Sequence, residues 1–297
     1  MSKAPVWLIE FTIIPRLAAD AERVVDLLVQ MVSDGIHVGY SKDPDGGGLI
    51  AKVIDEQNLD LVIDVLTRTQ TVELKVGSPR VVYRETLAGV VEVDYTHKKQ
   101  MGGRGQFARV KLRLEPNEAG AGNEFQSKIV GGVVPSEYIP GVEKGVQSVW
   151  ESGVLIGFPF LDTRVTLFDG AYHDVDSSAF AFETAARAAM RDDVVTASLK
   201  PMEPIMDVEV LSPDNFVGDV VADLNNRRGY IRGQEVRANA TMLRANAPLA
   251  QLFGFKRNLS SITNGRGSFA MRFSHYAEVP RGIGPDDFRP AVGMRRA

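Results

Sequence analysis

The sequence predicts an α+β protein of three domains, because the first and last thirds of its 297 residues show the same order of elements and the middle third does not. In both outer thirds that order is strand, helix, strand, strand, helix, strand. This βαββαβ order is the split β-α-β, or ferredoxin-like, pattern, in which both helices cover one face of an antiparallel sheet. We therefore expect ferredoxin-like sandwiches at 1–79 and 201–280, another α+β domain at 80–200, and a flexible tail at 281–297.

The first third provides the clearest periodicities. Asp20 is expected to cap its first helix and Gly35 to end it, because apolar residues between them recur at helical spacing. The stripes of the two helices are Val24, Leu27, Leu28 and Met31, and then Leu59, Val62, Ile63 and Leu66. The strands are expected at 6–14, 36–41, 49–54 and 71–76, with a turn at 43–48.

The middle third combines strands with two helices. One helix is expected between Pro140 and Gly153, and a second after an N-cap at Asp176 or Ser177. Strands are expected at 81–87 and 161–167, and a βαβ pairing is expected in this part of the chain. The inward faces of the two helices are Val142, Val146, Val149 and Trp150, and then Phe182, Ala185, Ala186 and Ala189.

The last third repeats the order of the first. Asp214 is expected to cap a helix that Gly229 ends, with Val217, Val220, Val221 and Leu224 turned inward. A strand at 205–211 precedes this helix. A strand pair at 230–245, a helix from Pro248 and a strand at 268–275 complete the pattern.

The composition narrows the classes of function. A net charge of -4 and a pI near 5.7 argue against a general nucleic-acid coat, so any RNA contact should be confined to a patch. The absence of Cys excludes disulfides and thiolate chemistry, and four scattered His make a histidine metal site unexpected. Without a signal peptide or a run of about eighteen apolar residues, we expect a cytoplasmic protein with no membrane partner.

The stretch from Tyr95 to Leu114 is locally basic, with six Lys/Arg and no acidic residue. Its centre, 102–106, is a glycine turn, and residues 107–114 alternate apolar and basic side chains, as expected for a strand with one wet, positive face. A glycine turn carrying Arg104 and Gln106 could touch RNA phosphates and base edges. A solvated hairpin explains the same residues equally well.

Residues 173–178, His-Asp-Val-Asp-Ser-Ser, bring together a histidine, two carboxylates and two hydroxyls. Neighbours on one helix-entry loop seldom converge on one point, so helix capping is favoured over a metal site or a catalytic triad. His173 would lie just before a helix N-terminus, which favours phosphate.

The basic pairs Arg227–Arg228 and Lys256–Arg257 are expected to be solvated helix ends. No P-loop sequence occurs, so neither GTP nor another cofactor is expected to bind, and no catalytic residue is assigned.

Several motifs, taken in order, resemble the C-terminal half of elongation factor G, from about residue 5 to 280. The resemblance implies that 1–79, 80–200 and 201–280 correspond to the family's domains III, IV and V, with a ribosomal protein S5-like fold in the middle domain. At 52–59 the chain lacks the family's Gly-Met-Gly-Glu-Leu-His-Leu turn, which weakens the expectation of coupling to a GTPase domain. The motifs lie at 83–86 (Tyr-Arg-Glu-Thr), 102–107 (Gly-Gly-Arg-Gly-Gln-Phe), 131–140, 172–178, 203–206, 218–229 and 248–254.

The resemblance implies a ribosome-binding module associated with translocation, whose middle domain meets ribosomal RNA, tRNA and mRNA at the decoding site. The family's GTPase domain is missing before Met1, so we expect a free-standing product or a truncation that is not an enzyme, with a GTPase domain acting in trans as a candidate partner. The alternative is a regulatory or structural protein that has left the ribosome; a hydrolase using His173 and Asp174 is remote. The implied RNA contacts are Lys98, Lys99, Gly103, Arg104, Gly105, Gln106, His173, Asp174, Ser177 and Ser178.

Overall fold

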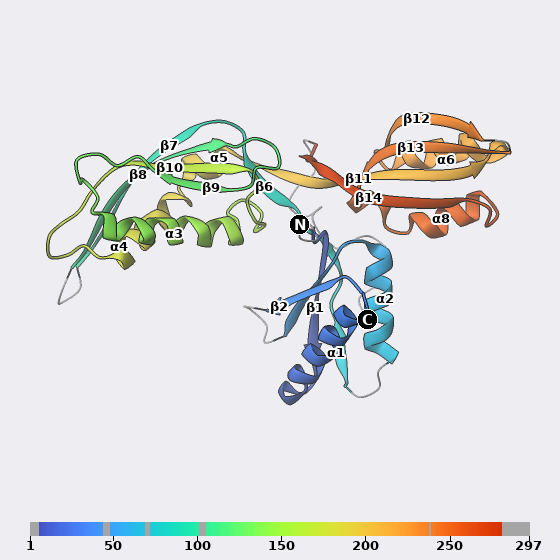
Figure 1. Cartoon of the computed structure of the whole chain (residues 1–297), viewed down its shortest axis with the longest axis horizontal. Helices are drawn as coiled ribbons and strands as arrows, with labels where there is room; N and C mark the ends of the chain where they lie inside the picture. The colour runs from blue at the N-terminus through green and yellow to red at the C-terminus, as the bar shows by residue number, and fades with distance from the viewer. Residues whose placement is uncertain (1–5, 44–47, 69–71, 101–104, 238, 281–297) are drawn as a thin grey trace. The chain divides into compact units, whose positions relative to one another are not determined.

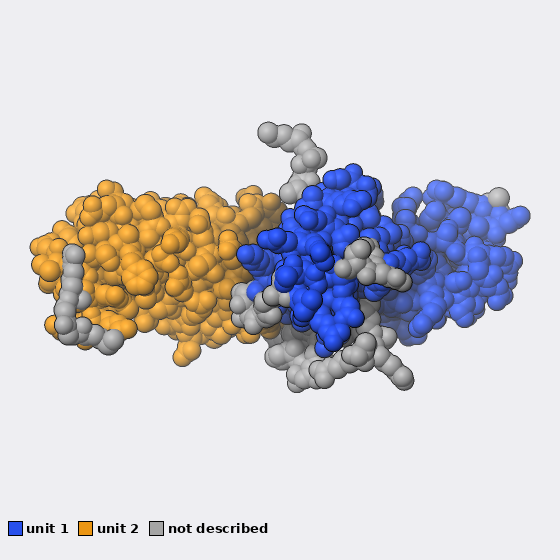
Figure 2. Space-filling model, turned by 90° about the horizontal axis from the view of Figure 1, so that it is seen from below, with its two compact units in different colours: residues 1–82, 203–297 blue, residues 83–202 orange. Residues whose placement is uncertain are grey.

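The computed structural model describes residues 6–43, 48–68, 72–100, 105–237 and 239–280. The chain divides into two compact units (Figure 2), one formed by residues 1–82 with 203–297 and the other by residues 83–202. The first unit contains two separate sheets, and the second contains one. No helix in the described ranges is long and apolar enough to cross a membrane.

The N-terminal sheet has the strand order β2-β3-β1-β4, and its pairings are antiparallel (Figure 1). This is the order that a βαββαβ chain produces, so the ferredoxin-like prediction is confirmed here. Both α1 and α2 bury every third or fourth residue, as their apolar spacing predicts, but Ile63 of the predicted α2 stripe is only partly buried. The elements are β1 (Ile9–Pro15), η1 (Ala18–Asp20), α1 (Ala21–Ser33), β2 (Val38–Lys42), β3 (Leu49–Val53), α2 (Glu56–Arg68), β4 (Leu74–Val76) and β5 (Arg80–Val81).

Two details of α1 differ from expectation. Leu27 is only partly buried, because the inward stripe consists of Val24, Leu28 and Met31. Asp20 stands at the N-cap position but makes no capping hydrogen bond, and its carboxylate instead accepts from Arg23 Nη1 at 3.1 Å. The predicted stop is correct, since Gly35 has φ 86°, a conformation that glycine adopts readily. The predicted turn at 43–48 lies largely outside the described residues.

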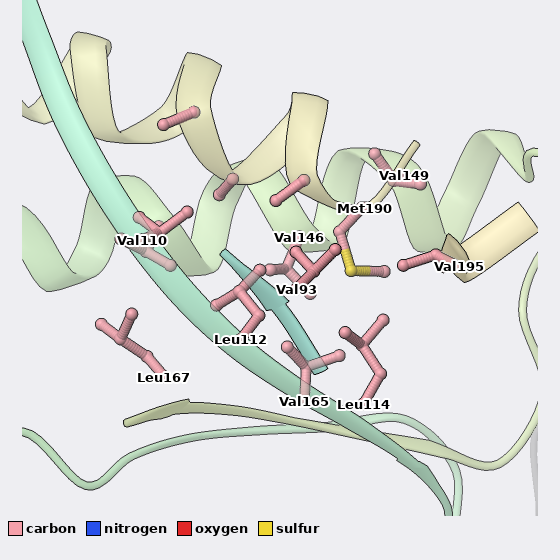
Figure 3. Close-up of a cluster of buried hydrophobic side chains, with 14 of the residues drawn as sticks. Val93, Val110, Leu112, Leu114, Val146, Val149, Val165, Leu167, Met190 and Val195 are labelled. Carbon is pink, nitrogen blue, oxygen red and sulfur yellow. The ribbon is translucent and has the colours of Figure 1, made fainter. Parts of the chain in front are cut away.

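The middle unit is a four-stranded sheet of order β7-β8-β10-β9 (Figure 1). Strands β9 and β10 pair in parallel and are connected through α3, so the expected βαβ pairing is present. Helices α3 and α4 bury the predicted apolar faces against the sheet (Figure 3). The elements are β6 (Arg84–Leu87), β7 (Val91–Lys99), β8 (Gln106–Pro116), β9 (Glu124–Ser127), η2 (Ser136–Tyr138), α3 (Ile139–Ser152), β10 (Thr163–Ala171), α4 (Ala179–Ala189) and α5 (Asp193–Ala197).

Helices α3 and α4 lie side by side and run in the same direction. A Cβ added to Gly141 would lie 2.3 Å from the carbonyl oxygen of Ala179, and one added to Gly145 would lie 2.4 Å from that of Glu183. One and two turns further on, Arg187 Nε donates to Ser148 Oγ at 3.1 Å, and Arg191 meets Ser152 in the same way. Both glycines therefore permit a close helix pair whose two N-termini lie at the same end of the unit.

The carboxylate of Glu85 is fully buried and organises the loop that follows α3. It accepts four backbone N–H groups, those of Val154, Leu155, Ile156 and Phe158, at 2.8–3.2 Å. Because four donors meet the two oxygens, the buried group is satisfied without a cation. Glu85 belongs to the 83–86 motif, and its role here is structural.

The C-terminal sheet has the order β12-β13-β11-β14, the second ferredoxin-like arrangement. The expected single helix from Pro248 is divided, because Gly254 takes a left-handed conformation with φ 71° between α7 and α8. The start of β11 also pairs with β6. The elements are β11 (Leu199–Pro213), η3 (Asp214–Phe216), α6 (Val217–Asn226), β12 (Tyr230–Arg237), β13 (Ala240–Pro248), α7 (Leu249–Leu252), α8 (Phe255–Ile262) and β14 (Ser268–Glu278).

The ends of α6 also correct the prediction. Asp214 does not cap it; its carboxylate accepts from Thr241 Oγ1 at 2.7 Å, and α6 starts three residues later. Past its end, Arg228 rather than Gly229 has the positive φ, 57°. Gly229 is needed for another reason, since a Cβ there would lie 2.6 Å from the carbonyl oxygen of Leu224. The buried face consists of Val220 and Leu224, without Val217 or Val221.

The basic residues of the C-terminal sandwich are largely used within it. Arg228 forms two 2.8 Å hydrogen bonds with Glu203, and Arg227 bonds to Asp223 and to the carbonyl oxygen of Gln251, so neither is the solvated helix end that was expected.

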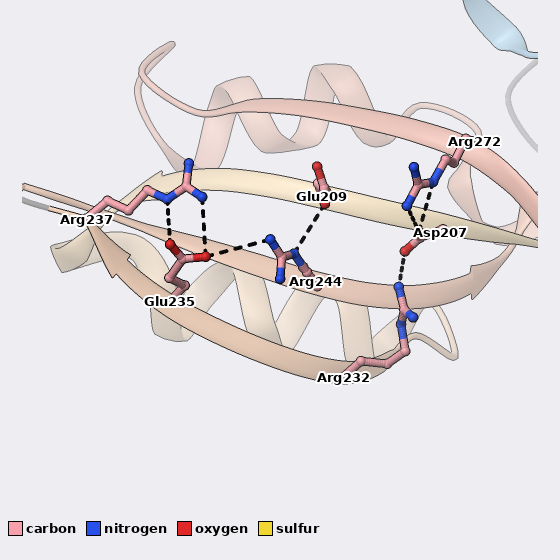
Figure 4. Close-up of polar contacts among 7 residues, drawn as sticks. All are labelled: Asp207, Glu209, Arg232, Glu235, Arg237, Arg244 and Arg272. Carbon is pink, nitrogen blue, oxygen red and sulfur yellow. Dashed lines mark hydrogen bonds and ion pairs between the residues drawn. The ribbon is translucent and has the colours of Figure 1, made fainter.

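The sheet face opposite the helices carries alternating Arg and carboxylate side chains (Figure 4). Burial raises the pKa of Asp207, but Arg272 and Arg232 outweigh it and hold that pKa below its usual value.

Candidate nucleic-acid interface

The tip of the middle unit is formed by two loops that the sequence places about seventy residues apart. The carboxylate of Asp176 accepts the N–H of Gly105 at 3.1 Å, and its backbone carbonyl accepts the N–H of Phe107 at 2.9 Å. Ser177 Oγ donates to the carbonyl oxygen of Phe107 at 2.7 Å. A Cβ on Gly105 would lie 2.9 Å from Asp176 Cγ, so glycine is required for this approach. The two predicted loops therefore form one surface.

His173 has a defined orientation on this surface. Its Nδ1 accepts the backbone N–H groups of Val175 and Asp176, each at 3.3 Å, which assigns the proton of the neutral ring to Nε2. Its side chain is 56% exposed, and its ring centroid lies 6.5 Å from that of Phe107. One ring nitrogen of His173 thus holds the loop, and the hydrogen on the other is not used by the loop.

Gln106 is fixed by a histidine on the neighbouring strand. His97 Nε2 lies 2.9 Å from Gln106 Oε1, so the ring donates to the amide oxygen. Lys98 and Lys99, at the end of β7, are exposed and make no ion pair within the described part of the chain. The surface therefore combines two ammonium groups with the side chains of Gln106 and His173.

The two helices add an electrostatic preference for anions at this end. Because α3 and α4 are parallel, the positive ends of both helix dipoles lie at the tip. Ser178 is the N-cap of α4, and its Oγ accepts the N–H of Ala181 at 3.2 Å. The expected cap at Asp176 or Ser177 is wrong, because those two side chains hold the hairpin instead.

The basic strand β8 does not form the positive face that its alternation predicts. Arg109 bonds to Asp94, Lys111 to Asp169 at 2.8 Å, and Arg113 contacts Glu92 and Glu115. The hydrogen bond from Arg109 holds the pKa of Asp94 below its usual value, and Lys111 does the same for the pKa of Asp169. The acidic partners come from β7, from β10 and from the end of β8, so this face is a mosaic of ion pairs.

Phe107 also departs from the predicted alternation. Ala108, not Phe107, is the buried residue that precedes Val110, so Phe107 lies on the same side of β8 as Arg109.

The ten residues predicted to contact RNA differ in what the structure shows of them. Gly103 and Arg104 lie outside the described residues. Ser177 is buried, so its hydroxyl positions the loops and cannot meet a ligand directly. The exposed or half-exposed members gathered at this end are Lys98, Lys99, Gly105, Gln106, His173, Asp174 and Ser178.

The sequence interpretation missed His97 and the joining role of Asp176. The signal for His97 was weak, namely its place nine residues before Gln106 across a hairpin. Asp176 offered a better signal, since a carboxylate beside an exposed glycine turn is a ready acceptor for that turn's N–H groups.

Over the described ranges, no three His, Asp or Glu side chains gather as they would around a metal ion.

The fold and the tip define the class: a multidomain α+β protein in which two ferredoxin-like sandwiches accompany a unit with an anion-favouring tip. Comparison with known proteins agrees. A family model for elongation factor G, domain IV matches residues 79–198, and one for the elongation factor G C-terminus matches residues 200–285. The chain belongs to the elongation factor G family, of which it carries these two domains.

Individual relatives show what share of a family member's length this chain covers. Elongation factor G of Rhodopseudomonas palustris (strain BisB18) is 50% identical over 279 residues, which cover 94% of this chain and 40% of the relative. That of Paracoccus denitrificans (strain Pd 1222) is 49% identical with the same coverage. A crystal structure of a Thermus thermophilus protein aligns with TM-score 0.73 and 32% identity over 99% of this chain and 44% of that one. The chain thus spans about two fifths of the length of these curated relatives.

Proposed function

We propose that this chain is a ribosome-binding module associated with translocation, and that the tip of the middle unit contacts ribosomal RNA, tRNA or mRNA at the decoding site. The observation that carries the proposal is the joining of the 105–106 and 173–178 loops at the common N-terminal end of α3 and α4. Unpaired ammonium groups and helix N-termini meet phosphates, while Gln106 and the Nε2–H of His173 meet base or ribose edges.

The proposal includes the three-domain division at 1–79, 80–200 and 201–280, and the absence of GTP binding by these residues. A GTPase domain acting in trans remains part of it as a partner. Because the β8 face is neutralised by acidic neighbours, RNA contact is restricted to the tip and does not extend along the strand.

Ribosome co-sedimentation across a range of salt concentrations tests the proposal. Each phosphate contact that is lost should reduce the slope of log affinity against log salt by roughly one. The double change Lys98→Ala/Lys99→Ala should therefore weaken binding and flatten the slope, whereas Gln106→Ala should weaken binding at an unchanged slope. Arg113→Ala, on the ion-paired face, is the control. If the tip variants bind like the parent chain, the alternative of a protein that has left the ribosome is favoured.

A further inference from the structure

A histidine and a glutamine form a side-chain pair at the tip end of the β7–β8 hairpin. His97 of β7 lies opposite Ala108 of β8. Gln106 precedes Ala108 by two residues and shares its face of the sheet, so His97 and Gln106 are diagonal neighbours. Nε2 of His97 lies 2.9 Å from Oε1 of Gln106. The register of the two strands therefore places the imidazole against the amide.

The pair leaves one polar group of each side chain without a partner. Within the described part of the chain, the Nε2 group of Gln106 and the Nδ1 atom of His97 make no hydrogen bond, and neither is buried. Because Oε1 of Gln106 is an acceptor, Nε2 of His97 carries the hydrogen of this contact. Both the neutral Nε2–H tautomer and the charged ring supply that hydrogen. The amide is therefore held with its oxygen toward the ring and its NH2 group free.

We propose that His97 is a positioning residue for RNA binding, which fixes the Gln106 amide so that its NH2 group donates to an uncharged acceptor of the RNA. Such an acceptor is a base carbonyl, a base ring nitrogen or a ribose oxygen. The last torsion of a glutamine is broad and roughly two-fold, so without His97 the oxygen and nitrogen of the amide can exchange places. The inference rests on the proposed function, since it names the chemistry of one contact at the tip.

A double-mutant cycle on ribosome binding tests the positioning role. Gln106→Met keeps the length of the side chain without a donor, and His97→Phe keeps a ring without an N–H. Each should weaken co-sedimentation of the full chain about threefold to tenfold, the effect of one hydrogen bond. In the Gln106→Met background, His97→Phe should have no further effect, because the ring acts through the amide. A histidine that only supports the hairpin would weaken binding equally in both backgrounds.

Three further variants identify the groups that the contact requires. His97→Lys keeps a donor and offers no acceptor, so it should recover most of the affinity that His97→Phe loses. Thr96→Lys in the His97→Phe background adds the same charge on the opposite face of β7, and it should not recover that affinity. Gln106→Glu keeps an acceptor for His97 but has no NH2 group, so it should bind no more tightly than Gln106→Met.

The histidine ring provides a measurement that needs no ribosome. Two-bond 1H–15N correlations of His97 in the free chain should show a hydrogen on Nε2 at both pH 6 and pH 8. An Nε2 without hydrogen overturns the inference, because the amide would then turn its NH2 group toward the ring.

The binding results separate this inference from the proposed function. The inference is overturned if Gln106→Met binds like the parent, if Gln106→Glu binds more tightly than Gln106→Met, if His97→Phe has the same effect in both backgrounds, or if His97→Lys recovers no more than Thr96→Lys. The proposed function survives each of these results when Lys98→Ala/Lys99→Ala still weakens binding and flattens the salt slope. A parent chain that does not co-sediment with ribosomes overturns both.

Discussion

Single residues at the tip act through the hydrogen bonds that orient them. His173 is informative, because its Nδ1 accepts two backbone N–H groups, whereas its Nε2 makes no hydrogen bond within the described part of the chain. Protonation of Nδ1 would remove an acceptor from both donors. The two hydrogen bonds therefore place the hydrogen of a neutral ring on Nε2, whereas the Asp176 carboxylate, 3.7 Å from Nδ1, is the partner of a charged ring.

This orientation predicts how His173→Ala responds to pH. If the neutral ring donates from Nε2, the loss of ribosome binding should be at least as large at pH 8 as at pH 6, because raising the pH can only increase the neutral fraction of an imidazole. Co-sedimentation at the two pH values, with Arg113→Ala as control, measures this. A defect confined to pH 6 would show that the imidazolium is the form that binds.

The ion pairs of the β8 face make a second prediction at this scale. Arg109→Ala removes the donor that lowers the pKa of Asp94, so that pKa should rise towards the ordinary value of about 3.9. A lowered carboxyl pKa contributes stability above the unfolded-state value, and that contribution disappears as pH falls through the folded-state pKa. NMR titration of the Asp94 carboxyl carbon between pH 2 and 6 measures the shift. An unmoved titration would mean that the pair is not formed in solution.

Elements were predictable from sequence where apolar spacing alone decides the structure. The inward faces of α3 and α4 are as the periodicity predicts, because buried side chains on a helix recur every three or four residues. Capping was less predictable, since Asp20 and Asp214 find other partners once the chain is folded. The neutral face of β8 could not be predicted, because its acids lie mainly on neighbouring strands. A linear pattern contains no information about the charges across a sheet.

The close pairing of α3 and α4 predicts a penalty at Gly145. In Gly145→Ala the new Cβ would overlap Glu183 O and the Cβ of Ala186, and forcing the helices apart should destabilise the middle unit by about 1–3 kcal/mol. Gly89→Ala is the matched control, since no atom lies within 4 Å of its added Cβ, and it should stay within about 0.5 kcal/mol of the parent. Urea unfolding followed by Trp150 fluorescence, in a Trp7→Phe background, makes the comparison. Equal stabilities would contradict the helix geometry.

The corrected face of α1 gives a second comparison within one element. Leu28 is fully buried, whereas Leu27 is partly exposed. Leu28→Ala should cost about 2–4 kcal/mol through cavity formation, and Leu27→Ala less than half as much. Trp7 lies in the same sandwich against Gly39, so its fluorescence, in a Trp150→Phe background, reports the unfolding. A larger loss of stability for Leu27→Ala than for Leu28→Ala would show that Leu27 belongs to the buried face, as the sequence predicts.

At the scale of the whole molecule, the fold class and the family could both be recognised from the sequence, because the βαββαβ order occurs twice and the motifs at 102–107 and 172–178 are specific. The joining of these two motifs into one surface required the structure. The carboxylate of Asp176 and the hydroxyl of Ser177 join the two loops, although the sequence pattern predicts helix capping for these residues. The account therefore depends most on whether this joined surface meets RNA on the ribosome.

Directed hydroxyl-radical cleavage tests that point most directly, since a chain without Cys accepts single-cysteine variants cleanly. An iron chelate attached to Asp174→Cys, an exposed tip position, should cleave ribosomal RNA at defined nucleotides of the decoding region when the chain is bound to ribosomes. The same chelate on Glu118→Cys, in the turn that follows β8 at the other end of that strand, should not cleave those nucleotides. Decoding-region cleavage from position 174 alone is the predicted result, and bound chain that cleaves no RNA there from position 174 would contradict the account.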